Sequence, residues 1–181
     1  MDQRLRRRGF VLIRRMFSLF LLAAMCRTAA FAQYEGDAVA RVLFEQGEKA
    51  LRSDNYADAI ADYKKAITLD PNFIEAHQQY ISTRQREPYL LLRAHTEKAT
   101  SEQEKAAAAA AEKQTQALAG EYEALAMEHP NSAVYPWALG KLYESSNVSR
   151  QEEYCRQALK IDSRFPPVTF AWPQLHSIEG T

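Results

Sequence analysis

The sequence contains few of the residues from which disulfides, phosphate-binding loops and membrane spans are built. Of its 181 residues, two are cysteine and six are glycine. Cys26 falls in an N-terminal segment that we expect to be removed, so Cys155 has no partner for an internal disulfide. The longest apolar run, residues 17–25, falls well short of the roughly 20 residues that a membrane helix needs. We therefore predict no transmembrane helix.

The usual signatures of catalysis and metal binding are also missing. The four histidines (His77, His95, His129 and His176) form no H-x-x-x-H pair and have no cysteine nearby in the sequence, which disfavours a zinc site. There is no G-x-S-x-G nucleophile motif and no G-x-G-x-x-G loop. We therefore predict no catalytic residue, no cofactor and no metal.

The N-terminus has the three parts of a secretory signal peptide. Six arginines between residues 4 and 15 precede the apolar run, and Ala30-Phe31-Ala32 has the small-x-small pattern of a cleavage site. We predict that residues 1–32 are a signal peptide cleaved after Ala32, and that the remainder is periplasmic or secreted. The alternative is a basic interfacial helix that stays attached. Two arginine pairs also resemble parts of a twin-arginine signal.

Removal of this segment changes the charge of the chain. Residues 1–32 hold seven of the 23 lysines and arginines and one of the 23 acidic residues, which leaves 16 against 22, a net charge of −6. An acidic chain is poorly suited to the phosphate backbone of a nucleic acid. We therefore expect no nucleic-acid partner.

Residues 40–72 predict two short helices joined by a tight turn. Small and apolar residues recur at spacings of three and four over 40–50 and again over 59–67. Asn55 lies where it can cap the second helix. Pro71 follows the second helix and ends it, because proline lacks the amide that a helix needs.

This hairpin resembles a tetratricopeptide repeat (TPR), a helix–turn–helix unit of 34 residues. With Ala40 as position 1, small residues fall where the two helices of that family touch. A tyrosine and a proline fall on further positions of the family pattern. The packing residues of this copy are Gly47, Ala59, Tyr63, Ala66 and Pro71. The resemblance implies an all-α fold, an αα-hairpin solenoid that binds other polypeptides.

A degenerate second copy lies near the C-terminus. Leu139-Gly140-x-x-Tyr143 matches the first helix of the family, and Ser149-x-x-Glu152 predicts a capping box for its partner helix. The packing residues of this copy are Gly140, Tyr143, Cys155 and Ala158. Cys155 is then a buried packing residue, and the alternative is a reactive or bridging thiol.

A third copy between these two contains an insertion. Leu118, Tyr122, Leu125 and Pro130 match its packing positions, but Pro71 and Pro130 are 59 residues apart, which is 34 plus 25. The sequence therefore predicts about two and a half to three repeats. Their ranges are about 40–73, 74–132 with a 25-residue insertion and 133–165, with 166–181 as a partial repeat or cap.

The insertion predicts one greatly elongated helix. Pro88 falls where the hairpin turn belongs, and residues 89–127 contain no proline and are rich in strong helix formers. We predict a single helix over 89–127 that projects beyond the solenoid, with the six alanines at 106–111 as a solvated rod. Two alternatives are a helix that docks or self-pairs, and a break at Thr100-Ser101-x-x-Glu104, which could cap a new helix.

The TPR resemblance also implies a set of binding residues. First helices line the concave surface in that family, so the candidate groove residues are Arg41, Phe44, Glu48, Leu51, Val134, Trp137, Lys141 and Glu144. Phe44 and Glu48 replace the lysine and asparagine of the family's clamp for a C-terminal carboxylate, so we expect no such clamp. Phe44 and Trp137 are either peptide anchors or packing residues.

These observations favour an exported, non-catalytic TPR scaffold or adaptor with a protein or peptide partner. The alternative is the N-terminal TPR portion of an exported multidomain enzyme, such as a thioredoxin-like oxidoreductase.

Overall fold

The computed structural model describes residues 38–167, apart from residues 97, 145 and 166. The predicted signal peptide and almost all of the expected partial repeat lie outside the described residues. Within them, residues 38–52 are helical, and five helices follow: α2 (Tyr56–Leu69), α3 (Ile74–His95), α4 (Ser101–Glu128), α5 (Val134–Leu142) and α6 (Val148–Ile161).

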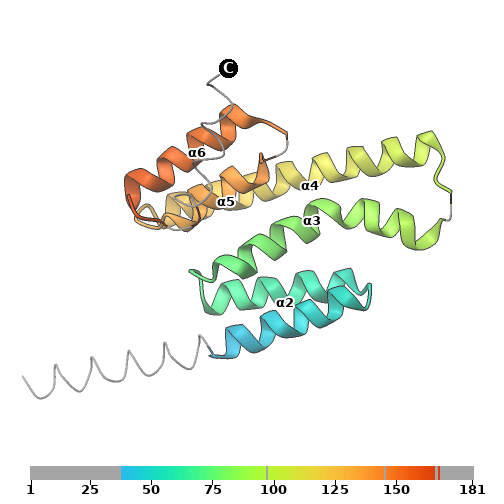
Figure 1. Cartoon of the computed structure of the whole chain (residues 1–181), viewed down its shortest axis with the longest axis horizontal. Coiled ribbons are helices and arrows are strands. Elements are labelled where there is room, and N and C mark those ends of the chain that lie inside the picture. Colours follow the sequence, from blue (N-terminus) through green and yellow to red (C-terminus); the bar gives the residue numbers. More distant parts are fainter. Residues whose placement is uncertain (1–37, 97, 145, 166, 168–181) are drawn as a thin grey trace, which may run out of the picture.

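Each helix packs against its neighbours in sequence, and α3 also contacts α5 (Figure 1). The described part of the chain contains no strand. The predicted all-α fold, a solenoid of helical hairpins, is therefore confirmed. No helix in this part is long and apolar enough to cross a membrane.

The first hairpin depends on close approach at Gly47. A Cβ atom at Gly47 would lie 2.7 Å from Cε1 of the fully buried Tyr63 ring, so only glycine leaves room for that ring. The Tyr63 hydroxyl donates a hydrogen bond of 2.7 Å to Glu48 Oε1. Asn55 caps α2, where its side chain accepts from the amide of Asp58.

One core runs through the successive hairpins. Tyr63, Tyr80 and Tyr122 come from α2, α3 and α4 and are almost completely buried. The predicted packing residues Ala59, Ala66, Leu118 and Ala158 are fully buried, whereas Leu125 and Tyr143 are half-buried and Pro71 and Pro130 lie exposed in turns.

The prediction of a single helix over 89–127 is wrong. The helix α3 continues through Pro88 to His95, and a separate helix, α4, begins at Ser101. Proline has a helix-compatible φ angle, so it can remain inside a helix and bend it while leaving the carbonyl of Arg84 without its usual donor. Figure 1 shows this bend in α3.

The helix α4 begins at the break that the sequence offered as an alternative. The Thr100 side chain accepts from the amide of Gln103 at 3.3 Å, and Gln103 Oε1 accepts from the amide of Thr100 at 2.9 Å. This is a complete capping box, formed with Gln103 and not with Glu104.

The extra residues therefore lengthen two helices. The helices α3 and α4 have 22 and 28 residues, compared with 14 in α2. Their ends run beyond the short helices as a pair, which we call the distal hairpin, residues 86–114 (Figure 1). Ala107 is only 7 % exposed, and Gln114 Nε2 donates to Glu87 Oε2 at 2.9 Å. The alanine run thus packs on α3 along one side and is not the isolated rod that we predicted.

The third hairpin joins α5 and α6. A Cβ atom at Gly140 would lie 3.3 Å from Cys155 Sγ, so the two helices touch at this glycine. The predicted capping box from Ser149 is wrong: Asn147 caps α6 by accepting from the amide of Arg150 at 3.1 Å. Asn147 lies two residues earlier, so Ser149 becomes part of the first helical turn.

Candidate functional site

An open groove separates the start of α3 from α5 and α6. It has a volume of about 280 Å³, and its main lining residues are Ile74, Glu75, Gln78, Trp137, Gly140, Lys141, Glu144, Gln151 and Cys155. We call it the α3–α5 groove. Its two long walls are the first helices of consecutive hairpins, which are held in place by the buried core behind them.

The charged groups of this groove are mostly acidic. Lys141 forms an ion pair with Glu144, whereas Glu75 is exposed and takes part in no ion pair among the described residues. Gln78 and Gln151 add uncharged amides. Burial, followed by the negative charge of Glu144 and Glu152, raises the pKa of the Cys155 thiol, so the thiol at the groove stays protonated at neutral pH.

The structure brings only part of the predicted groove set together. Trp137, Lys141 and Glu144 line the α3–α5 groove. Trp137 is only 7 % exposed and lies edge-on to Phe165, with ring centroids 6.3 Å apart, so it mainly packs. Val134 is buried in the core.

The predicted residues from the first helical segment lie elsewhere. Phe44 packs on Tyr63 and Phe73, with ring centroids 5.7 and 5.0 Å away, and Arg41 lies over the Phe73 ring. Glu48 accepts the Tyr63 hydrogen bond, and Leu51 packs half-buried against the core. Phe44 therefore acts as a packing residue in this structure.

The sequence-based set missed Glu75 and Gln78 of the groove. Their repeat positions could have identified them. Counted from Ile74, they hold positions 2 and 5 of the second repeat, and the same positions were used to choose groove residues in the first and third repeats. They belong to an exposed stripe along one side of α3, which we call the α3 stripe. Its residues follow at spacings of three and four, which places them on one helix face: Glu75, Gln78, Ser82, Arg86, Tyr89 and Arg93.

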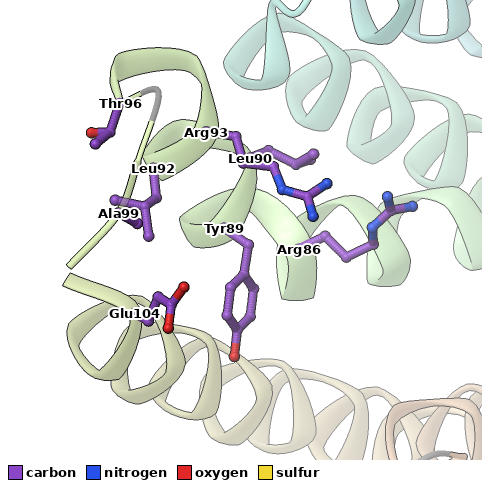
Figure 2. Close-up of a pocket in the computed structure, with 8 residues that line it drawn as sticks. All are labelled: Arg86, Tyr89, Leu90, Leu92, Arg93, Thr96, Ala99 and Glu104. Atoms are coloured by element: carbon purple, nitrogen blue, oxygen red, sulfur yellow. The ribbon is translucent and has the colours of Figure 1, made fainter. Parts of the chain in front are cut away.

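The far end of the α3 stripe lines a second cavity, within the distal hairpin. This distal notch has a volume of about 630 Å³, and Figure 2 shows its lining. The guanidinium groups of Arg86 and Arg93 extend to the same side of α3, whereas Tyr89 points toward α4. Glu104 stands on the opposite wall, and no ion pair among the described residues includes either arginine.

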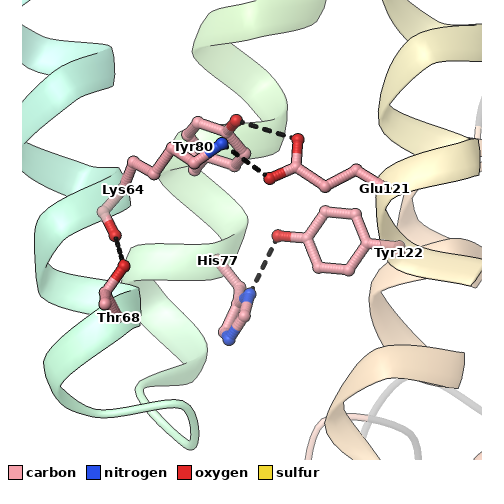
Figure 3. A network of polar contacts seen from close by, with 6 residues as sticks. All are labelled: Lys64, Thr68, His77, Tyr80, Glu121 and Tyr122. Atoms are coloured by element: carbon pink, nitrogen blue, oxygen red, sulfur yellow. Dashed lines mark hydrogen bonds and ion pairs between the residues drawn. The ribbon is translucent and has the colours of Figure 1, made fainter. Parts of the chain in front are cut away.

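A polar network ties α2, α3 and α4 together beneath these surfaces (Figure 3). Lys64 Nζ and the Tyr80 hydroxyl donate to the two carboxylate oxygens of Glu121, at 2.9 and 3.3 Å. The hydroxyl of Tyr122 donates to Nδ1 of His77 at 2.8 Å. This network positions the long helices. Among the described residues, no cluster of three or more histidine, cysteine or acidic side chains could hold a metal ion.

Successive helical hairpins with an open groove between their first helices define a helical-repeat protein. The tetratricopeptide repeat family model matches residues 40–73, which form the first hairpin. The comparison with curated proteins finds no match.

Proposed function

We propose that this protein is an exported, non-catalytic TPR scaffold or adaptor that binds a segment of another polypeptide in the α3–α5 groove. The observation that carries the proposal is the groove itself, which lies between the first helices of two consecutive hairpins. A TPR match is typical of modules with protein partners.

The lining suits a peptide segment. The amides of Gln78 and Gln151 can donate to and accept from a peptide backbone, and Ile74 and the edge of Trp137 offer apolar contact. At about 280 Å³ the groove is at the lower limit of small-molecule sites, and it is open, so it fits a few side chains of a longer segment. Its walls are helices fixed by the core, which limits the entropy lost on binding.

Export is proposed from the N-terminal pattern. A basic segment, a short apolar run and Ala30-Phe31-Ala32 together are typical of a cleaved secretory signal.

A pair of matched variants tests the groove. Gln78→Trp places a large ring on the exposed groove wall without entering the core, and Gln116→Trp makes the same change on an exposed face of α4, away from the groove. Partners captured from a periplasmic extract by the full chain should be lost with Gln78→Trp and kept with Gln116→Trp. Capture that is equal for both variants would contradict binding in this groove.

A further inference from the structure

We propose that the bound partner segment is extended and bipolar, with a basic side chain in the α3–α5 groove and an acidic side chain in the distal notch. The inference rests on the proposed function and specifies the chemistry of its partner. It follows from the charges at the two ends of the α3 stripe.

The α3 stripe makes the two cavities parts of one surface. Its six residues repeat at spacings of three and four, so all of them lie on one side of the helix. Five of the six are exposed, and Ser82 is half-buried. Glu75 and Gln78 line the α3–α5 groove at the start, and Arg86, Tyr89 and Arg93 line the distal notch at the end.

The charges at the start of the α3 stripe favour a basic side chain of the partner. Lys141 is engaged with Glu144, and Glu75 is a second carboxylate with no ion pair among the described residues. These three groups carry a net charge of −1, from two carboxylates and one ammonium group. A lysine or arginine of a partner is the group that complements them.

The charges at the end of the α3 stripe favour an acidic side chain of the partner. Arg86 and Arg93 line the notch, and Glu104 is the one carboxylate of its lining, so the lining carries a net charge of +1. A guanidinium group offers two parallel donors that match a carboxylate. Tyr89, which is 43 % exposed, adds an aromatic surface to the lining of the notch.

The length of α3 sets the spacing between the two charges. Arg86 and Arg93 follow Glu75 by 11 and 18 residues, which at about 1.5 Å per residue gives roughly 16 to 27 Å. The bend at Pro88 makes the larger distance an upper limit. An extended peptide covers about 3.3 Å per residue, so the two charged residues should be roughly five to eight positions apart.

This spacing also gives a physical role to the insertion. Tyr89 and Arg93 lie in the part of α3 that exceeds the 14-residue length of α2, and Glu104 lies in the corresponding part of α4. The distal notch therefore exists because both helices are long.

Selection from a random twelve-residue peptide library displayed on phage, against the immobilised full chain at low salt, tests the inference. We expect enriched peptides with a lysine or arginine and an aspartate or glutamate five to eight residues apart. Enriched peptides that bind the groove but lack this charge pair would overturn the inference and leave the proposed function standing. No enrichment of any peptide would overturn both.

Charge exchange on one enriched peptide gives the decisive measurement. Arg86→Glu with Arg93→Glu should weaken its binding roughly fivefold or more, and changing the acidic residue of the peptide to lysine should restore the loss. Lys105→Glu with Lys113→Glu changes the same charge on exposed positions of the same hairpin, outside both linings, and should have a smaller effect. Equal losses for the two double variants, or no restoration by the lysine peptide, would overturn the inference.

Discussion

The hydroxyl of Tyr122 donates a hydrogen bond of 2.8 Å to Nδ1 of the fully buried His77, and this contact joins α4 to α3. The other ring nitrogen, Nε2, lies 3.0 Å from the carbonyl oxygen of Pro71. A carbonyl can only accept, so Nε2 carries a proton, and in the neutral imidazole Nδ1 then accepts from Tyr122. Burial lowers the pKa of His77 to about 4, and the Pro71 carbonyl offsets this only in part.

This contact predicts acid sensitivity. An unfolded histidine has a pKa of about 6.5. Below that pH the histidine is protonated in the unfolded state, whereas His77 stays neutral in the folded state. The buried neutral His77 therefore makes its full contribution to the free energy of unfolding above pH 6.5, and this contribution is lost as the pH falls toward 4. At 1.36 kcal/mol per pKa unit the full loss is about 3 kcal/mol.

Thermal melting at pH 7.5, 6 and 5 checks this prediction. His77→Gln keeps one donor and one acceptor but does not titrate, so its midpoint should fall less between pH 7.5 and 5 than that of the unmodified chain. His129→Gln, at an exposed histidine, should retain the original pH dependence. The same fall in all three proteins would assign the acid sensitivity to other groups.

Gly47→Ala should destabilise the first hairpin. Its new Cβ would lie 2.7 and 2.8 Å from two carbons of the Tyr63 ring, which is fully buried and has no free space to enter. Overpacking of this kind costs about 1–3 kcal/mol, which urea unfolding would measure as a lower midpoint.

The matched control is Gly120→Ala, at a glycine in the middle of α4 with nothing within 4 Å of a new Cβ. Alanine is favoured over glycine in a helix by roughly 0.5–1 kcal/mol, so this variant should be more stable. A Gly47→Ala midpoint equal to or above that of the unmodified chain would show that the glycine is not required by the ring.

Pro88→Ala should make the distal part of α3 more resistant to opening. The alanine amide can donate to the carbonyl of Arg84, and the steric clash of the proline ring is removed. Hydrogen exchange should therefore slow for the amides of residues 89–95. The amides of residues 118–126 serve as the internal reference, because this core segment of α4 should exchange slowly in both proteins. Unchanged exchange in 89–95 would mean that the proline does not limit the stability of this segment.

Export predicts a defined N-terminus. The chain recovered from the extracytoplasmic fraction should begin at Gln33, because signal peptidases cleave after a small-x-small pattern such as Ala30-Phe31-Ala32. Intact-mass measurement checks the prediction. Recovery of the chain with residues 1–32 still attached would favour the interfacial-helix alternative.

Local rules located the two helices of the first hairpin, and the family resemblance located their contact. Spacings of three and four indicated the helices, Asn55 and Pro71 marked the boundaries of the second one, and the TPR pattern placed Gly47, Ala59 and Tyr63 where the helices touch. These features act within a few residues of one another, which is where propensity and capping rules apply.

The distal hairpin was harder to predict because two local signals competed. Pro88 favours a helix end, but Gln85 and Glu87 directly before it are hydrogen-bonded to Thr115 and Gln114 of α4, and these contacts help to offset the cost of one missing hydrogen bond. The sequence also showed a capping signal at Thr100. It did not show whether the helix boundary lies at Thr100 or at Pro88. The distal notch was therefore missed, because Tyr89 and Arg93 were assigned to the wrong helix.

The lengths of α3 and α4 determine how far the distal hairpin extends beyond the stacked short helices. They exceed the 14 residues of α2 by eight (22 − 14) and 14 (28 − 14), or roughly two and four turns at 3.6 residues per turn. The addition to α4 is about 3.9 turns, so α4 presents nearly the same side to α3 at both ends, whereas the addition to α3 is about 2.2 turns and contains the bend at Pro88. Removing whole turns from both helices of the distal hairpin should therefore shorten the α3 stripe, and with it the proposed spacing between the two charge sites, while the core of the shorter helices stays as it is.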